Sequence, residues 1–446
     1  MKRIITLMLS AALTFALVAP AAAVEYKGFG DMSAGFVYLD NVNDNFSKDK
    51  TDHLMAHNRV RIGVEVIASE NLKGIFYVTT NNMRWGDDAR FGNVTWGNNG
   101  GPFVRQAYLD WRIPGTPVRL KMGEQIVVLP GAMGSPILHT ALPALTANIK
   151  ATDNVSVNLG WARVGDTGGA PASGLKDQGT DIFFATVPLS FGAFNVTPWG
   201  SYAVAYKEAS ASVFPKDAKI IHVGVNVDAT VIEKLRIRGD LMYGGTAVKD
   251  NDARTETKGF FADLKVTYKT SFGDLGGIAW YSSGGKKDKD KGGHIPTFGG
   301  TAWGLNSTEE NGFGPTSFLS YGNAPLTTGQ FLTKTGVGTL GIGPVLENVS
   351  FVEKLAHNFR LVYWKGTIDF NNRSTIPTGG AGAIDKKTSY IEANIDSRYT
   401  IYPGFITFFE IGFAAVNWSK DLKYDGAGDK KKTNGYRAGW SFHYAF

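Results

Sequence analysis

The chain ends with the sequence GYRAGWSFHYAF, residues 435–446. Side chains along a β-strand point alternately to opposite faces, with a period of two residues. In this stretch every even-numbered position is apolar or aromatic, as at Trp440 and Phe446, and every odd-numbered position is small or polar, as at Arg437. One face of such a strand can lie against lipid while the other faces water. The pattern therefore predicts a strand in the wall of a membrane-spanning β-barrel.

The same alternation recurs along the chain. Apolar residues between Val60 and Val66 share one face of a predicted strand, and Arg59, Arg61 and Glu65 share the other. A soluble β-sandwich buries its apolar face and joins its strands by shorter loops. A barrel in a membrane needs the inverse arrangement, apolar outside and charged inside, and this is the arrangement that the sequence favours.

The first 23 residues have the pattern of an export signal. Lys2 and Arg3 precede a short apolar run, which is too short to span a bilayer, and small residues follow up to Ala23. We therefore expect a cleaved signal peptide at 1–23 and a barrel formed by 24–446. Because no later apolar run has helical spanning length, a closed barrel is the form in which this chain could cross a membrane.

The composition excludes several classes of site. The chain has no cysteine, so it has neither disulfides nor thiolate metal sites. The formal charge of +6 falls to +4 without Lys2 and Arg3, which leaves 44 basic and 40 acidic residues, and no basic block indicates a nucleic-acid partner. The seven histidines are scattered without metal-ligand or catalytic spacing. The glycine-rich stretch at 336–341 lacks the strand-and-helix context of a dinucleotide site. We expect no enzyme activity, no catalytic residues, no metal and no cofactor.

Short turns and long polar segments alternate between the predicted strands. The long segments lie near 40–56, 83–102, 127–144, 164–180, 207–218, 246–259, 284–334, 366–387 and 419–434. Nine long loops and eight short turns predict eighteen strands, with both termini on the turn side. Sixteen strands remain an alternative if the weak strand near 145–151 belongs to a loop. Aromatic residues near strand ends are expected to form the outward girdles of the barrel: Tyr26, Trp111, Trp161, Tyr243, Tyr268, Tyr363 and Tyr399.

These features together resemble the trimeric diffusion porins of Gram-negative outer membranes. The signal peptide and Phe446 are shared with such barrels, and the stretch Arg105–Gln125 is similar to the strand, turn and strand before their inward-folded third loop. The resemblance implies an all-β, antiparallel transmembrane barrel of 16–18 strands (18 preferred), with an inward-folded third loop at 127–144. It also implies a homotrimer in the cell outer membrane that contacts lipid and lipopolysaccharide, and an assembly signal at Phe446 that the barrel-assembly machinery reads.

The charges beside the third loop are the candidates for a pore constriction, because selectivity follows the narrowest ring of side chains. The candidate constriction residues are Arg59, Arg61, Asp110, Arg112, Arg119 and Lys121, with Glu65 and Glu124 as further acidic groups on the same inner face. The local balance is basic, and 127–144 contains no Asp or Glu, in contrast to the acidic third loop of familiar porins. We therefore expect a mild preference for anions. The alternative is that these charges pair across neighbouring strands and only stabilise the wall.

The sequence favours a passive pore for small hydrophilic solutes and inorganic ions. Two alternatives remain. Eighteen strands also resemble substrate-selective channels for sugars or amino acids, and inward Tyr108 and Trp364 would suit a sugar path. The long loop at 284–334 would suit a surface adhesion or structural barrel.

Overall fold

The structure is a computed structural model. It describes residues 24–40, 52–80, 83–85, 102–164, 179–206, 217–248, 257–285, 293–298, 336–369, 385–419 and 432–446. The signal peptide expected at 1–23, and most of each long loop other than the third, lie outside these residues. The described part is made of β-strands joined by turns and contains no helix, so it has no helix that could cross a membrane.

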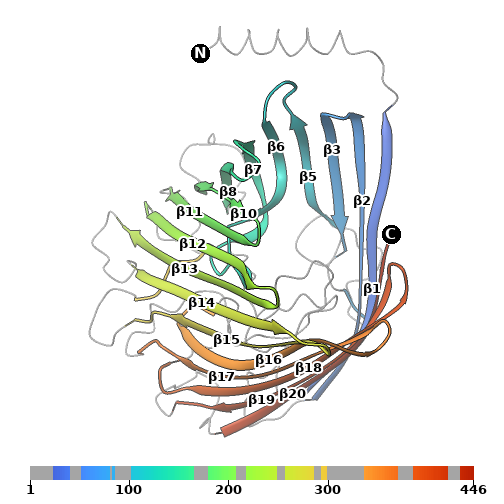
Figure 1. The fold of residues 1–446 in the computed structure, drawn as a ribbon, viewed down its shortest axis with the longest axis vertical. Coiled ribbons are helices and arrows are strands. Elements are labelled where there is room, and N and C mark those ends of the chain that lie inside the picture. The colour runs from blue at the N-terminus through green and yellow to red at the C-terminus, as the bar shows by residue number, and fades with distance from the viewer. Residues whose placement is uncertain are drawn as a thin grey trace.

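The strands follow one another around a single sheet in chain order (Figure 1). They are β1 (Glu25–Asp40), β2 (Asp52–Ser69), β3 (Leu72–Thr79), β4 (Met83–Arg84), β5 (Phe103–Arg112), β6 (Val118–Val128), β7 (His139–Lys150), β8 (Ser156–Val164), β9 (Thr180–Thr186), β10 (Leu189–Phe191), β11 (Phe194–Ala205), β12 (Lys219–Ile232), β13 (Leu235–Ala247), β14 (Lys258–Lys269), β15 (Asp274–Ser282), β16 (Thr339–Val352), β17 (Leu355–Gly366), β18 (Ser389–Tyr402), β19 (Phe405–Asn417) and β20 (Lys432–Ala445).

These elements form a closed antiparallel barrel of eighteen strands. The two-residue β4 pairs with β2 beyond the end of β3, and so extends that strand. β9 and β10 both pair with β11 and are parts of one strand, interrupted where Pro188 has no N–H to donate. The preferred count of eighteen is thus confirmed. The weak strand near 145–151 belongs to β7, which excludes the alternative of sixteen.

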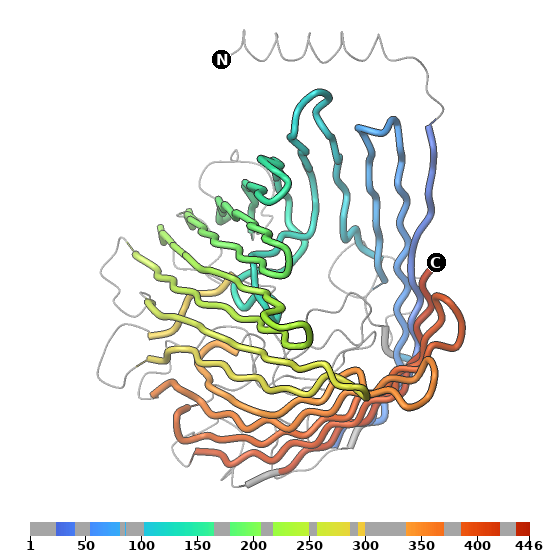
Figure 2. The backbone as a smooth tube through the Cα atoms, in the orientation of Figure 1, coloured from blue at the N-terminus to red at the C-terminus, as the bar shows by residue number. Residues whose placement is uncertain are grey.

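The barrel closes where the first strand meets the last (Figure 2). The amide of Gly30 donates to the carbonyl of Phe446 at 2.9 Å, and the amide of Phe446 donates to the carbonyl of Gly30 at 3.0 Å. A side chain at position 30 would lie 2.4 Å from the carbonyl oxygen of Arg61 and 2.9 Å from the Phe446 ring. Glycine is therefore required there for the C-terminal residue to complete the sheet.

The alternation predicted for the C-terminal strand is confirmed. Trp440, Tyr444 and Phe446 are about half exposed on the outer face, whereas Arg437 and Ser441 are buried on the inner face. The seven aromatic residues predicted to form girdles all lie exposed on the outer face: Tyr26, Trp111, Trp161, Tyr243, Tyr268, Tyr363 and Tyr399. The exposed outer surface of the barrel is mainly apolar and aromatic, as is expected for a lipid-facing surface.

The inner face changes from charged to apolar along each strand. Near the short turns it is charged, as at Arg236 and Arg238 of β13, and toward the long loops it becomes apolar, as at Met242. The same change occurs on β17 between Arg360 and Trp364. The apolar inner residues form one buried cluster with the segment that joins β6 to β7. The core of this barrel therefore lies inside its loop-side half.

The loop predicted at 127–144 is shorter in the structure. β6 continues to Val128 and β7 begins at His139, so the non-strand segment is 129–138. Val127 and Leu142 are inward and buried, which continues the strand alternation into the predicted loop.

Candidate functional site in the barrel interior

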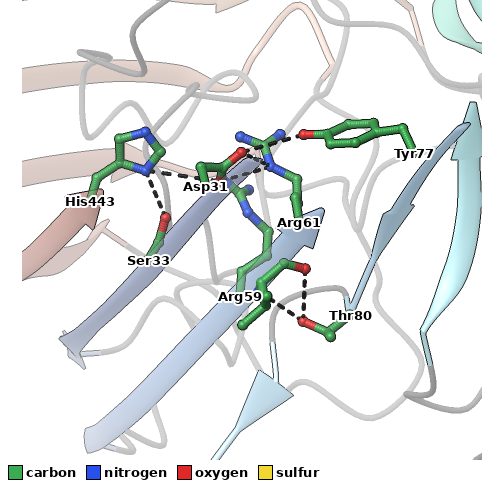
Figure 3. Close-up of polar contacts among 8 residues, drawn as sticks. Asp31, Ser33, Arg59, Arg61, Tyr77, Thr80 and His443 are labelled. Atoms are coloured by element: carbon green, nitrogen blue, oxygen red, sulfur yellow. Dashed lines mark hydrogen bonds and ion pairs between the residues drawn. The ribbon is translucent and has the colours of Figure 1, made fainter. Parts of the chain in front are cut away.

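The carboxylate of Asp31 is the centre of a group of polar contacts on the inner wall, close to where the first and last strands pair (Figure 3). The Arg61 Nε donates to both oxygens of Asp31, at 2.9 and 2.7 Å, and the Tyr77 hydroxyl donates to the same group at 3.3 Å. A terminal nitrogen of Arg59 lies 3.7 Å from Asp31, and the His443 ring lies 4.0 Å from it. The structure thus brings Arg59 and Arg61 together around one acid that the sequence interpretation did not include.

A third arginine on this wall was missed. Strict alternation would place Arg105 on the outer face with Ala107, but β5 has a bulge opposite Tyr77. A bulge adds one residue and re-aims a side chain. The charge of Arg105 acts on Arg59 and Tyr77, which places it on the inner face. Two guanidinium groups therefore face Asp31, and a third lies on the same inner wall, where the irregular strand pairing places it.

A second group of charges lies on the neighbouring strands β5 and β6. Arg119 makes two hydrogen bonds to the buried Asp110, at 2.6 and 2.5 Å, and Lys121 lies opposite Asp110 with its ammonium 5.3 Å from the centre of the Tyr108 ring. Arg112 is exposed near the turn, opposite Arg119. Much of the predicted constriction set is therefore paired across strands, as the alternative interpretation expected. Whether these residues line the narrowest part of a pore stays a prediction.

Glu65 and Glu124, the further acids expected near the constriction, lie on opposite faces. Glu65 is inward and accepts a hydrogen bond from Lys73 at 2.8 Å. The prediction that Glu124 faces inward is wrong. It pairs with the outward Ala107, whereas its neighbour Gly123 pairs with the inward Tyr108. Because Lys121 is inward and side chains alternate, the residue three positions later must face outward.

The segment 129–138 contacts the inner wall at a strand distant in sequence. The amide of Ala132 donates to the carboxylate of Asp240 on β13, and Asn226 donates to the other oxygen of that carboxylate at 2.9 Å. The side chains of Leu129 and Ile137 are fully buried in the apolar cluster. That this segment narrows a pore stays a prediction.

A second internal segment, 293–298, packs beside it. The amide of Phe298 donates to the carbonyl of Ile137 at 2.9 Å. On β12 the buried His222 donates from Nε2 to the Pro296 carbonyl at 2.8 Å, and its Nδ1 accepts from the Ser201 hydroxyl at 3.1 Å. A carbonyl can only accept, which fixes this tautomer. The two segments are thus joined to each other and to the wall on β12 and β13.

A polar cavity lies between this segment and the turn-side wall of β12–β16. Its volume is about 560 Å³, and Gly131 and Ala132 line it opposite the strands. Its charged lining residues are Lys234, Arg236, Arg238, Lys265 and Lys269, with Asp228, Glu233, Asp274 and Glu347. Five cationic groups and four carboxylates give the cavity a small positive excess. The sequence analysis did not place these strands in the site.

Buried ion pairs link neighbouring strands in the wall of this cavity. Glu347 pairs with Lys265 at 2.6 Å and with Arg360 at 2.9 Å, and Arg360 also pairs with Asp396 at 3.0 Å. Arg236 and Asp228 form a bidentate pair at 2.8 and 2.6 Å. In the described part of the chain, no group of three His, Cys, Asp or Glu residues is placed to hold a metal ion. The arrangement can select solutes by size and charge.

Comparison with known proteins identifies the fold. No protein-family model and no curated protein sequence matches the chain. Among solved structures, OpdQ of Pseudomonas aeruginosa matches with a TM-score of 0.55 and 13% identity, over 94% of this chain and 99% of that one. A BenF-like porin of Pseudomonas fluorescens Pf-5 matches with 0.55 and 9%, also over 94% and 99%. OpdK of Pseudomonas aeruginosa, solved with vanillate, matches with 0.52 and 10% over the same shares. The chain therefore has the barrel fold of outer-membrane porins.

Proposed function

We propose that this barrel is an outer-membrane channel for the passive diffusion of small hydrophilic solutes and ions. The observation that carries the proposal is a closed barrel of eighteen strands with an apolar outer face and a charged inner wall around a polar cavity of about 560 Å³. Such a wall offers dissolved solutes a path that the apolar outer face does not. Transport of this kind needs no catalytic residue and no cofactor.

The charge balance of the inner wall supports a mild preference for anions. Beside Asp31, the guanidinium groups of Arg59 and Arg61 outnumber the carboxylate, and Arg105 adds a positive charge on the same inner wall. The polar cavity carries a further excess of one positive charge among its lining residues. In a confined channel such an excess raises the local concentration of anions, even when most charges are paired.

A substrate-selective channel is the second candidate. Similarity to OpdK, which was solved with vanillate, favours it at the level of the fold. The cavity adds a specific observation: its wall carries both positive and negative groups, so an orientated solute would meet both signs at fixed positions. An ion-diffusion pore needs no such arrangement.

Several further features belong to the proposal. The 129–138 segment, held at Asp240, forms the constriction. Residues 1–23 direct export, Phe446 is read by the barrel-assembly machinery, and the mature barrel is a homotrimer in contact with lipopolysaccharide. Surface adhesion through the long loop at 284–334 is the competing view for a barrel that does not conduct.

Single-channel recording in a planar bilayer, with unboiled protein under a salt gradient, tests the proposal. Large ohmic steps with a reversal potential of anion sign are the expected result. Steps of cation sign would keep the channel and reject the charge assignment. Saturation of flux by one class of solute would favour the substrate-selective candidate. A correctly folded, heat-modifiable barrel without conductance would reject the channel and support adhesion.

A further inference from the structure

The ring of Phe29 lies against the inner wall of the barrel. Phe29 is on β1, two residues before the inward Asp31, and is directly opposite Gly63 of β2. A side chain in a strand usually stands roughly perpendicular to the sheet. This ring leans sideways instead, because a Cβ atom at position 63 would lie 2.3 Å from its Cζ and 2.7 Å from its Cε2. The ring therefore occupies the place that a side chain at position 63 would need.

This position brings Phe29 into contact with a ring from the third strand. Tyr77 of β3 lies directly opposite Gly63, on the other side of β2. The backbones of β1 and β3 are about 9.6 Å apart, which is twice the spacing of neighbouring strands. The centroids of the two rings are nevertheless only 5.3 Å apart, and the rings are stacked at an interplanar angle of 28°. The missing side chain of Gly63 thus allows two rings to pair across the strand between them.

The ring pair places a hydrogen-bond donor on the carboxylate of the candidate site. Tyr77 is buried, and its hydroxyl donates to Asp31 at 3.3 Å (Figure 3). The same carboxylate is bonded to Arg61, and Arg59 lies 3.7 Å from it. The side chains of these two arginines stay partly exposed, at 22% for Arg61 and 17% for Arg59. The flat rings and the exposed positive charges therefore share one part of the inner wall.

The arrangement of ring and glycine recurs around the barrel. Three further glycines are directly opposite an inward aromatic residue of a neighbouring strand, and a Cβ atom at each would lie within 2.6 Å of the ring: Gly160 with Phe184, Gly224 with Trp199, and Gly341 with Trp280. The two tryptophans are buried in the apolar cluster of the loop-side half, whereas Phe29 is partly exposed. Of these four rings, Phe29 is the one beside the charges around Asp31.

We infer that Gly63 is a positioning residue of the channel. It keeps the rings of Phe29 and Tyr77 flat against the wall, so that the lumen enclosed by the wall stays wide beside the two arginines. Gly63 touches no solute and acts through Phe29. The inference rests on the proposed function, because the width of the lumen matters only in a barrel that conducts. The contact between the ring and the glycine can also be tested by folding alone.

The single-channel conductance of folded barrels tests the inference. Gly63→Ala forces the Phe29 ring away from the wall, and the conductance is expected to fall by about a third or more, because the narrowest cross-section limits the current. Gly439→Ala is the matched control. A Cβ atom at this inward glycine of β20 would lie 3.5 Å from Oε2 of Glu410, an ordinary contact, so the conductance should keep its wild-type value. Equal conductance of the two variants would overturn the inference.

Removal of the ring provides the rescue. In the double variant Gly63→Ala with Phe29→Ala, no ring is left at position 29 to enter the lumen, and the conductance should return at least to the wild-type value. A purely structural role of Gly63 does not predict this recovery. A reduced conductance that the double variant fails to restore would show that the ring is not its cause, and would overturn the inference.

Heat-modifiable migration on a gel covers the case in which Gly63→Ala does not fold. The double variant lacks the clashing ring and is then expected to regain the folded barrel, whereas a double variant that also fails to fold would overturn the inference. This comparison of folding does not depend on conduction. A folded wild type that conducts no current would reject the proposed function, and the comparison of folding would still decide whether the ring needs a glycine at position 63.

Discussion

The amide of Ala132 donates a hydrogen bond to the carboxylate of Asp240, 108 residues away in the sequence. Asp240 is buried on the inner face of β13, and Asn226 donates to its other oxygen. This contact ties the segment between β6 and β7 to the opposite wall. It also forms one edge of the polar cavity, because Ala132 lines that cavity.

Removing this acceptor should loosen the segment. A hydrogen bond to a charged group contributes roughly 1.5–3 kcal/mol, so Asp240→Ala should make the detached state more than about tenfold more populated. We expect larger and noisier single-channel currents. Asp240→Asn keeps an acceptor oxygen and serves as the control. Identical current noise in the wild type and both variants would contradict a role for this contact.

The arginines around Asp31 should set the sign of selectivity. Arg59→Glu exchanges one positive for one negative charge without removing the Arg61–Asp31 pair. The reversal potential under a salt gradient should move toward that of a cation-selective channel. Lys219→Gln also removes a positive charge, but from the outer face of β12, and should leave the reversal potential unchanged. A similar shift in both variants would show that net charge, not the inner wall, controls selectivity.

The buried ion-pair network should make Glu347 important for stability. Its carboxylate serves both Lys265 and Arg360, whose side chains are 3% and 0% exposed. Glu347→Gln leaves two buried cations without this partner, which typically costs about 3–5 kcal/mol. The barrel should then lose its heat-modifiable fold at a lower temperature. Asp153→Asn breaks the exposed Lys150–Asp153 pair and should have no measurable effect. Equal stability of the two variants would argue against the network.

Most of the fold could be predicted because the period-two pattern and the turn residues are local. The alternation at Trp440 and Arg437 fixes the two faces, and the strand count follows from turns that are visible in the sequence. The error in the length of the third loop has a physical origin. Val127 and Leu142 look like loop residues because polar inward positions are expected, whereas both belong to a buried apolar cluster that also includes Leu129 and Ile137.

The site was harder to predict from the sequence, because the register between neighbouring strands decides which side chains become partners. The pairing of Arg61 with Asp31 joins two strands whose alignment no local pattern gives. The bulge that turns Arg105 inward has no sequence signal of its own. The outward position of Glu124, in contrast, could have been found by counting three residues from Lys121.

The seam between Gly30 and Phe446 should control assembly. Deleting Phe446 removes both backbone hydrogen bonds to Gly30, whereas Phe446→Ala keeps them and removes only the ring. If the aromatic ring is read as an assembly signal, both changes should lower the folded fraction in the outer membrane, and Phe446→Tyr should restore it. If only the backbone bonds matter, Phe446→Ala should assemble normally. Protease protection of folded barrel in isolated membranes distinguishes these results.

Acid should weaken the packing of the 293–298 segment. Burial lowers the pKa of His294 from 6.5 to about 4. Between these values the unfolded or undocked chain binds a proton that the docked segment does not, so stability falls as the pH falls from 7 toward 4. The shift corresponds to a loss of up to about 3 kcal/mol at pH 4. Because Phe298 of this segment is bonded to Ile137, current noise should rise over the same range.

His294→Asn removes the titrating group from the segment and provides the comparison. Its thermal stability should depend less steeply on pH than that of the wild type between pH 6.5 and 4, and its current noise should rise less. Above pH 7 the two proteins should have the same slope, because His294 is neutral in both states there. Parallel pH profiles throughout would mean that this histidine stays charged when the segment is docked, which its burial does not allow, or that the segment does not dock.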